Sequence, residues 1–175
     1  MLKIGKIKHI EHTLFPTTKH KLREIIENEI NKNRYSCSIN HIDVSKITDM
    51  SNLFNGFGDK IRKIKISEWD VSNVTNMNGM FKNCNKFNCD LSEWDVSNVT
   101  DMRSMFYGCQ RFASDLSRWD VSKVTNMGNM FNNCTSLIEV EELNVGRVTA
   151  ITSMFNECHS IRNVNLVYLK ASVQF

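Results

Sequence analysis

Hydrophobic and polar positions follow a pattern that returns along most of this chain. Three copies of W-D-V-S-x-V-T-x-M begin at Trp69, Trp94 and Trp119, each 25 residues after the one before. Weaker copies begin at Ile42 and Leu143. A fixed period of about 20–50 residues is typical of stacked repeats, in which each copy forms one rung and neighbouring rungs share a core. The pattern therefore predicts an α/β solenoid.

The apolar spacing within one copy predicts two elements. The sequence M-x-x-M-F-x-x-C at 77–84 places its apolar residues at i, i+3, i+4 and i+7, which predicts a short helix. Thr75 precedes it at a position where a hydroxyl can cap the first turn. The sequence L-x-x-W-x-V at 91–96 predicts a short buried strand. We expect each rung to contribute a strand, a turn and a helical turn, with the strands stacked in parallel.

The chain divides into two parts that we expect to pack as one domain. Residues 1–41 hold an arm and an amphipathic helix that begins after Thr17 or Thr18 and runs to about Asn33. Residues 42–175 hold about four full rungs and a C-terminal half-rung. We expect the helix to cap the first rung. The alternative, a helix on a membrane surface, is less favoured because its polar face mixes glutamate with lysine and arginine.

The charge and composition of the chain do not favour nucleic acid binding or membrane insertion. The chain has 22 Lys and Arg against 19 Asp and Glu, a formal net charge of +3. The excess lies before the repeats, which does not favour nucleic acid as a partner. The short basic run Lys60, Arg62, Lys63 and Lys65 is interpreted as a solvated edge. We find no secretory signal pattern or apolar run of about 20 residues, so the expected localisation is cytoplasmic as written, with no membrane insertion.

The cysteines of the repeats are interpreted as structural residues rather than as metal ligands. Four cysteines repeat at one position of the copies: Cys84, Cys109, Cys134 and Cys158. We interpret this column as small reduced core thiols, with a disulfide between rungs as the alternative, and without the paired C-x-x-C motifs of zinc sites.

A second column, of aspartates, admits two interpretations. Asp43, Asp70, Asp95 and Asp120 each precede a serine by two residues, which favours hydrogen bonds within a turn, and calcium binding is the alternative. His9-x-x-His12 is interpreted as polar surface. We predict no metal, cofactor or catalytic residue, and no motif of a known enzyme class is present.

Variable polar positions beside the constant apolar columns are the candidate binding residues. Such positions are free to select a partner, whereas the core columns are fixed by packing. The predicted partner-binding face on the exposed strand positions consists of Glu68, Asn73, Glu93, Asn98, Arg118, Lys123 and Arg147.

The unit W-D-V-S-N-V-T-x-M-x-x-M-F-x-x-C-x-x-F-x-x-D-L-S resembles the BspA-like repeats of bacterial surface proteins and lipoproteins. The resemblance extends from Ile42 to Cys158. It implies a leucine-rich-repeat-like solenoid and a binding or adhesive role, and supplies no catalytic residues. Members of that family are often surface-exposed or secreted, unlike the localisation expected from this sequence.

Two hypotheses of function follow, and neither is an enzyme. The first is a protein-binding or adhesion-type scaffold that recognises a protein partner through the exposed strand face. The second is an intracellular regulatory or effector protein whose N-terminal arm and helix make the specific contact. The sequence leaves the partner and the oligomeric state open.

Overall fold

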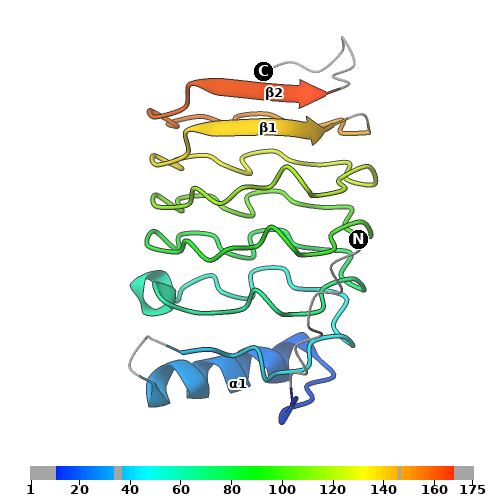
Figure 1. The fold of residues 1–175 in the computed structure, drawn as a ribbon, viewed down its shortest axis with the longest axis vertical. Coiled ribbons are helices and arrows are strands. Elements are labelled where there is room, and N and C mark those ends of the chain that lie inside the picture. The colour runs from blue at the N-terminus through cyan, green and yellow to red at the C-terminus, as the bar shows by residue number, and fades with distance from the viewer. Residues whose placement is uncertain (1–10, 34–36, 146, 168–175) are drawn as a thin grey trace, which may run out of the picture.

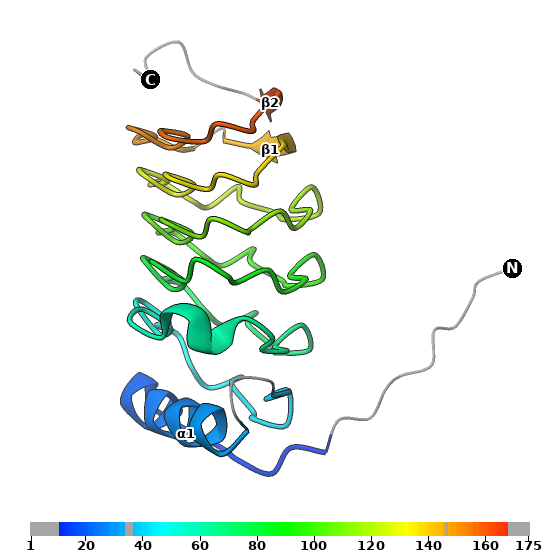
Figure 2. The ribbon, with the colours of Figure 1, turned by 90° about the vertical axis from the view of Figure 1, so that its left-hand side faces the viewer.

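The repeats lie one above the other in the computed structural model, which describes residues 11–33, 37–145 and 147–167. Helix α1 (Lys19–Lys32) covers one end of the stack. Strands β1 (Glu139–Asn144) and β2 (Asn163–Val167) lie at the other end, as Figures 1 and 2 show. The short 3₁₀ helix η1 (Gly58–Ile61) protrudes from the first full rung. Whether the stack is related to leucine-rich repeats stays a prediction.

The capping helix is placed as the sequence predicts. The hydroxyl of Thr18 accepts a hydrogen bond from the Lys21 N–H at 3.2 Å, which satisfies one of the free amides of the first turn. The buried side of α1 is formed by Leu22, Ile26 and Ile30. These side chains belong to the same apolar cluster as the rungs, so α1 closes the core at this end.

Backbone hydrogen bonds join each rung to the next along one line. Isolated parallel bridges connect Asp49, Asn76, Asp101, Asn126 and Ala150 in that order. Beside this line the threonines that recur at one position of the repeats form a second ladder. The Thr100 N–H donates to Thr75 O at 2.8 Å, and its hydroxyl donates to the same oxygen at 3.1 Å. The predicted role of Thr75 as a helix cap is therefore wrong, because its hydroxyl bonds the preceding rung at Thr48 O.

The predicted helix at 77–84 is also wrong, because this segment is a series of tight turns. Alternate N–H groups donate to the carbonyl three residues earlier, and the groups between them donate to the neighbouring rung. The Phe81 N–H, for example, donates to Met105 O at 2.9 Å. Gly79 and Asn83 have φ values of 62° and 61°, as at the third position of a type II turn, and these interrupt a right-handed helix.

Strands occur in the described residues only where the turn chemistry of the repeats is lost. At 91–96 the predicted strand is a turn, in which the Trp94 N–H donates to Leu91 O at 3.1 Å. The equivalent stretch at 139–144 replaces D-L-S-x-W by E-V-E-E-L and is extended as β1. Strand β2 pairs with β1 in parallel, with Val140 opposite Val164.

The predicted core columns are buried. Trp94 and Trp119 are 3% and 4% exposed, and the valine, methionine and cysteine columns are buried with them. Phenylalanine rings stack along the axis with centroids 5.2–5.7 Å apart: Phe54, Phe81, Phe106, Phe131 and Phe155. Each indole N–H also donates to a carbonyl of the preceding rung, as Trp94 Nε1 does to Ile66 O at 3.1 Å. Stacking thus satisfies the polar atom of each buried indole.

Candidate functional site

The first column of the predicted partner-binding face contains Glu68, Glu93 and Arg118. Arg118 forms an ion pair with Glu93 across one rung spacing, and both side chains are 69% exposed. Glu68 is half-buried, and its N–H donates to Asn40 Oδ1 at 3.3 Å. These residues lie beside turns, because the strands predicted at this place are absent from the inner rungs.

The second column is linked from rung to rung by side-chain hydrogen bonds. The Asn73 and Asn98 amides donate to Ser45 O and Ser72 O at 2.9 and 2.8 Å. Lys123 Nζ donates to Asn98 Oδ1 at 2.6 Å, and Arg147 is exposed one rung further on. The two asparagines therefore help to hold the stack, whereas the cations lie on its outside.

The aspartate column forms turns, as the sequence favours. The Ser97 and Ser122 N–H groups each donate to the carboxylate two residues earlier at 3.0 Å. Hydrogen bonds from these serines hold the pKa values of Asp95 and Asp120 below the usual range, because they favour the ionised carboxylate. Across the described residues, no group of three or more His, Cys, Asp or Glu is placed to hold a metal ion.

The cysteine column forms a ladder of free thiols in the core. The Cys109 S–H donates to Phe81 O at 3.0 Å, and the Cys134 S–H to Phe106 O at 3.1 Å. Burial raises the pKa of the Cys84 thiol to about 12 and that of Cys109 well above its usual value. The interpretation as core thiols is confirmed in this structure, and burial makes thiolate chemistry at these positions unfavourable.

A small apolar pocket, not anticipated from the sequence, lies between the fourth rung and β1. Its volume is about 290 Å³, and its walls come from 113–117, 137–140 and Phe131. Ile138 at its mouth is 52% exposed. The change from D-L-S-x-W to E-V-E-E-L at 139–143 signals this place in the sequence, because it ends both the turn and the tryptophan column.

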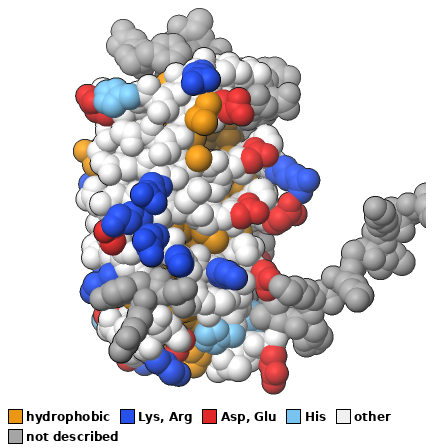
Figure 3. Space-filling view, turned by 60° about the vertical axis from the view of Figure 1, so that its left-hand side comes forward, with side chains coloured by type: hydrophobic (Ala, Val, Ile, Leu, Met, Phe, Trp, Pro, Cys, Tyr) orange, Lys and Arg blue, Asp and Glu red, His pale blue; other side chains and the backbone are white. Residues whose placement is uncertain are grey.

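A basic groove lies on the adjoining side of the stack. Its lining contains Arg62, Lys63, Lys86 and Arg111, contributed by three successive rungs. Figure 3 shows a cluster of basic side chains, hydrophobic atoms beside it and acidic side chains beyond. The sequence run at 60–65 supplies two of these cations, and stacking brings Lys86 and Arg111 next to them. Only the tertiary structure reveals this clustering.

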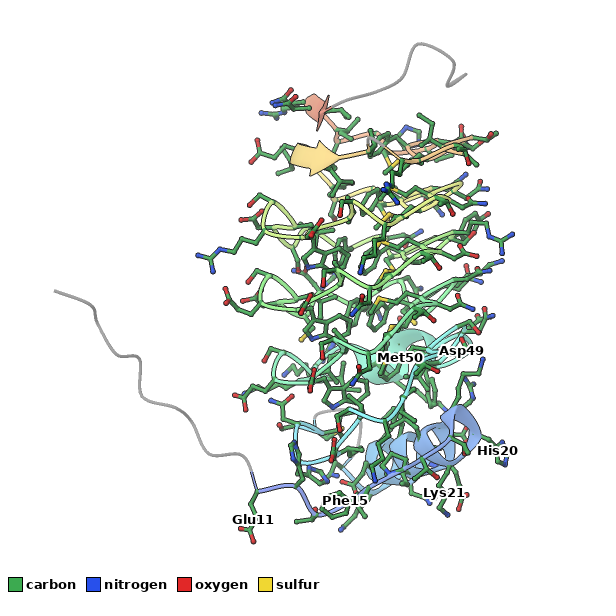
Figure 4. The ribbon with its side chains drawn as sticks, turned by 90° about the vertical axis from the view of Figure 1, so that its right-hand side faces the viewer. Glu11, Phe15, His20, Lys21, Asp49 and Met50 are labelled. Atoms are coloured by element: carbon green, nitrogen blue, oxygen red, sulfur yellow. The ribbon has the colours of Figure 1, made fainter. Side chains whose placement is uncertain are left out.

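Polar contacts hold α1 to the first rung of the stack. Lys19 Nζ donates to Asp49 Oδ2 at 2.7 Å, and Arg23 donates to three backbone carbonyls at 52–55. Figure 4 shows His20 and Lys21 on the outer side of α1 and Glu11 at the foot of the edge that carries β1 and β2. His9 lies outside the described residues. No helix in the described ranges has the length and apolar character needed to cross a bilayer.

Most of this chain matches the model of a known protein family. A family model described as "Mycoplasma protein of unknown function, DUF285" matches residues 21–139 and again 57–168, so together the matches span most of α1 and the repeats. Comparisons with curated proteins and with solved structures find no match.

Proposed function

We propose a protein-binding function for this chain, which belongs to the DUF285 family of Mycoplasma proteins of unknown function. In this proposal the chain is a non-enzymatic scaffold of the solenoid type. It recognises a protein partner through the partner-binding face that runs from Glu68 to Arg147 along the outside of the stack.

The observation that supports this proposal is the contrast between a constant interior and a variable exterior. In the core, Trp, Val, Met, Phe and Cys recur at the same positions and are buried. On the outside, the position of Glu93 becomes Arg118, and that of Asn98 becomes Lys123 and then Arg147. Exposed ion pairs such as Arg118–Glu93 contribute about 0–1 kcal/mol to stability, so stability alone does not account for these side chains.

The resemblance to BspA-like repeats extends the proposal to adhesion. The repeat unit W-D-V-S-x-V-T-x-M with its M-x-x-M-F-x-x-C continuation carries that resemblance. Under this proposal the stack is a relative of the leucine-rich-repeat solenoids and presents a long, stiff surface to another protein. A rigid surface favours binding because little conformational entropy is lost on association.

The alternative, in which the arm and α1 make the specific contact, is less favoured. Lys19 and Arg23 are directed to the first rung, where they bond Asp49 and the carbonyls at 52–55. Leu22, Ile26 and Ile30 of α1 are buried in the same apolar cluster as the rungs. The helix therefore uses its apolar side and two of its cations to close the core.

The test compares two triple charge reversals that change the net charge equally. Arg118→Glu, Lys123→Glu and Arg147→Glu alter the predicted face. Arg62→Glu, Lys63→Glu and Arg111→Glu alter the basic groove and serve as the matched control. We expect crosslinking capture from the native cell to lose a specific partner with the first set and to retain it with the second.

The reverse result would move the binding surface to the basic groove. Deleting residues 1–10 tests the alternative and leaves the backbone pairing of Leu14 with Ile42 in place. Loss of the partner in that deletion, with the first triple variant still binding, would favour the arm as the contact. Circular dichroism of each variant shows whether the stack remains folded.

A further inference from the structure

One side of the stack presents a cation, then a small or polar residue, then an aspartate across each of two successive rungs. Burial alternates there, because Phe87 and Leu91 are buried in one rung and Phe112 and Leu116 in the next. Such alternation places every second side chain on the outside. The outward residues are Lys86, Asn88 and Asp90 in one rung and Arg111, Ala113 and Asp115 in the next.

Hydrogen bonds between the two rungs align these residues into columns. The Ala113 N–H donates to Asn88 Oδ1 at 3.0 Å, so these two residues are neighbours along the stack. The Arg111 N–H donates to Asn85 O at 3.1 Å, which places Arg111 next to Lys86 in the same way. Each column therefore repeats one kind of side chain at the spacing of the rungs.

The following rung continues the columns and adds an exposed isoleucine. The Ser136 N–H donates to Gln110 O at 2.9 Å, so the register is unchanged. Ile138 then follows Ala113 in the central column and is 52% exposed. Figure 3 shows this order on the surface, with hydrophobic atoms between basic and acidic side chains. We call this surface the three-column face: its basic column contains Lys86 and Arg111, its central column Asn88, Ala113 and Ile138, and its acidic column Asp90, Asp115 and Glu139.

The outer columns keep charge that the molecule itself does not neutralise. Lys86 forms an ion pair with Asp59, whereas no ion pair among the described residues involves Arg111. One oxygen of Asp90 and one of Asp115 accept from the N–H of the serine two residues later, at 3.0 and 2.9 Å. These hydrogen bonds hold the pKa values of both aspartates below the usual range, so both carboxylates are ionised at neutral pH. The second oxygen of each can accept from another molecule.

A two-fold axis along the central column makes two such faces complementary. Rotation by 180° about this axis exchanges the basic and acidic columns and keeps the height along the stack. Lys86 then lies opposite Asp90 of a second copy, and Arg111 lies opposite Asp115 of that copy. An axis across the stack would instead place Lys86 opposite Arg111, and like charges in contact oppose association.

We propose that two copies of this chain associate through the three-column face, about a two-fold axis parallel to the stack. Such a contact is isologous, so each charge pair occurs twice. On the axis, the small side chain of Ala113 allows the two faces to approach. The apolar pocket beside Ile138 has a volume of about 290 Å³ and receives Ile138 of the second copy, since a cavity of about 150 Å³ already holds benzene.

The size of the face predicts a weak, concentration-dependent dimer. Only three rungs contribute, which places the contact among small interfaces that bury less than about 1,200 Å² in total. Charge complementarity then sets the orientation of the two copies more than the strength of the complex. Self-association goes beyond the proposed partner binding and does not depend on it, because the three-column face and the partner-binding face share no residue.

Sedimentation velocity of the purified chain tests the association without any other protein. The weight-average mass should rise from the monomer value of 20.3 kDa toward twice that value between about 10 µM and about 500 µM. Lys86→Glu with Arg111→Glu makes both outer columns acidic, and Asp90→Lys with Asp115→Lys makes both basic. Each variant alone should stay monomeric. An equimolar mixture of the two should associate again, because acidic faces then meet basic faces.

Asp95→Lys with Asp120→Lys is the matched control for the second variant. It changes the net charge equally and removes the same kind of turn hydrogen bond, but outside the three-column face, so it should associate as the wild type does. Ile138→Glu leaves every turn intact and should abolish association by placing two carboxylates beside the axis. Circular dichroism shows whether each variant is folded.

Three results would overturn the proposal. The first is a wild-type chain that stays monomeric up to about 500 µM. The second is association of Ile138→Glu as strong as that of the wild type. The third is a mixture of the two folded charge variants that remains monomeric, because the pairing about the two-fold axis requires it to associate.

Discussion

Replacing Trp94 by alanine tests how the repeat columns stabilise the stack. The indole is 3% exposed, and its ring lies 6.3 Å from that of Phe81 between centroids. Its N–H donates to Ile66 O at 3.1 Å. The substitution removes the ring from the middle of the stack, where it lies beside Phe81 of the preceding rung, and leaves the Ile66 carbonyl without this donor.

The magnitude follows from the buried area and the cavity. A buried aromatic side chain removes about 150–250 Å² from water, which corresponds to about 4–6 kcal/mol at about 25 cal/mol per Å². This is an upper estimate, because the unfolded chain already buries part of that area and alanine keeps part of it. Truncations of buried aromatics to alanine cost about 3–5 kcal/mol. We expect a loss of about 4 kcal/mol in the free energy of unfolding.

Urea denaturation followed by far-UV circular dichroism measures this loss without depending on tryptophan emission. The comparison requires an unchanged m-value, so that a shifted midpoint reports stability rather than a different unfolded state. Glu93→Ala is the matched control, because its side chain is exposed, adjacent in sequence and in a surface ion pair, and should cost less than about 1 kcal/mol. A cost below about 1 kcal/mol for Trp94→Ala would refute the buried column.

Three further predictions use other features of the rungs. Gly79→Ala should lower the free energy of unfolding measured in urea by about 1–2 kcal/mol, because φ is 62° and a Cβ would lie 2.6 Å from Asn52 Oδ1. The control Gly128→Ala, at a position without a positive φ, should lower it by less. A thiol reagent at pH 8 should modify the half-buried Cys89 before the buried Cys109, and equal rates in the folded chain would contradict the thiol ladder. Folding lowers the pKa of Asp95, so the ionised carboxylate stabilises the folded state at pH values above its unfolded pKa of about 3.9. This stabilisation is lost as the pH falls through the folded pKa. Between pH 5 and pH 3 the urea midpoint of Asp95→Asn should therefore fall less than that of the wild-type chain.

The sequence was informative about burial and about local side-chain chemistry. The spacing of Leu22, Ile26 and Ile30 after Thr18 predicts α1, and the structure places the helix at Lys19–Lys32. The period of 25 residues predicts which side chains are buried, because every inner rung has the same neighbours. The aspartate turns were also predictable, since an aspartate bonds an N–H two residues later without help from distant residues.

The candidate site was less predictable. The predicted face is exposed, yet the sequence did not show that Asn98 would bond Ser72 O and accept from Lys123. Such contacts join residues about 25 positions apart, so they depend on the register between rungs. The basic groove and the apolar pocket depend on the same register, because each is assembled from more than one rung.

The sequence alone thus determined the repeat, the buried columns and the capping helix. Only the tertiary structure decided the backbone conformation of each rung. The spacing i, i+3, i+4, i+7 shows which side chains face the core, but consecutive tight turns produce it as well as a helix does. In this chain the Phe81 N–H donates to Met105 in the next rung, and positive φ at Gly79 and Asn83 permits the turns. The hydrogen-bond partners of the backbone lie in another repeat, so no single repeat specifies them.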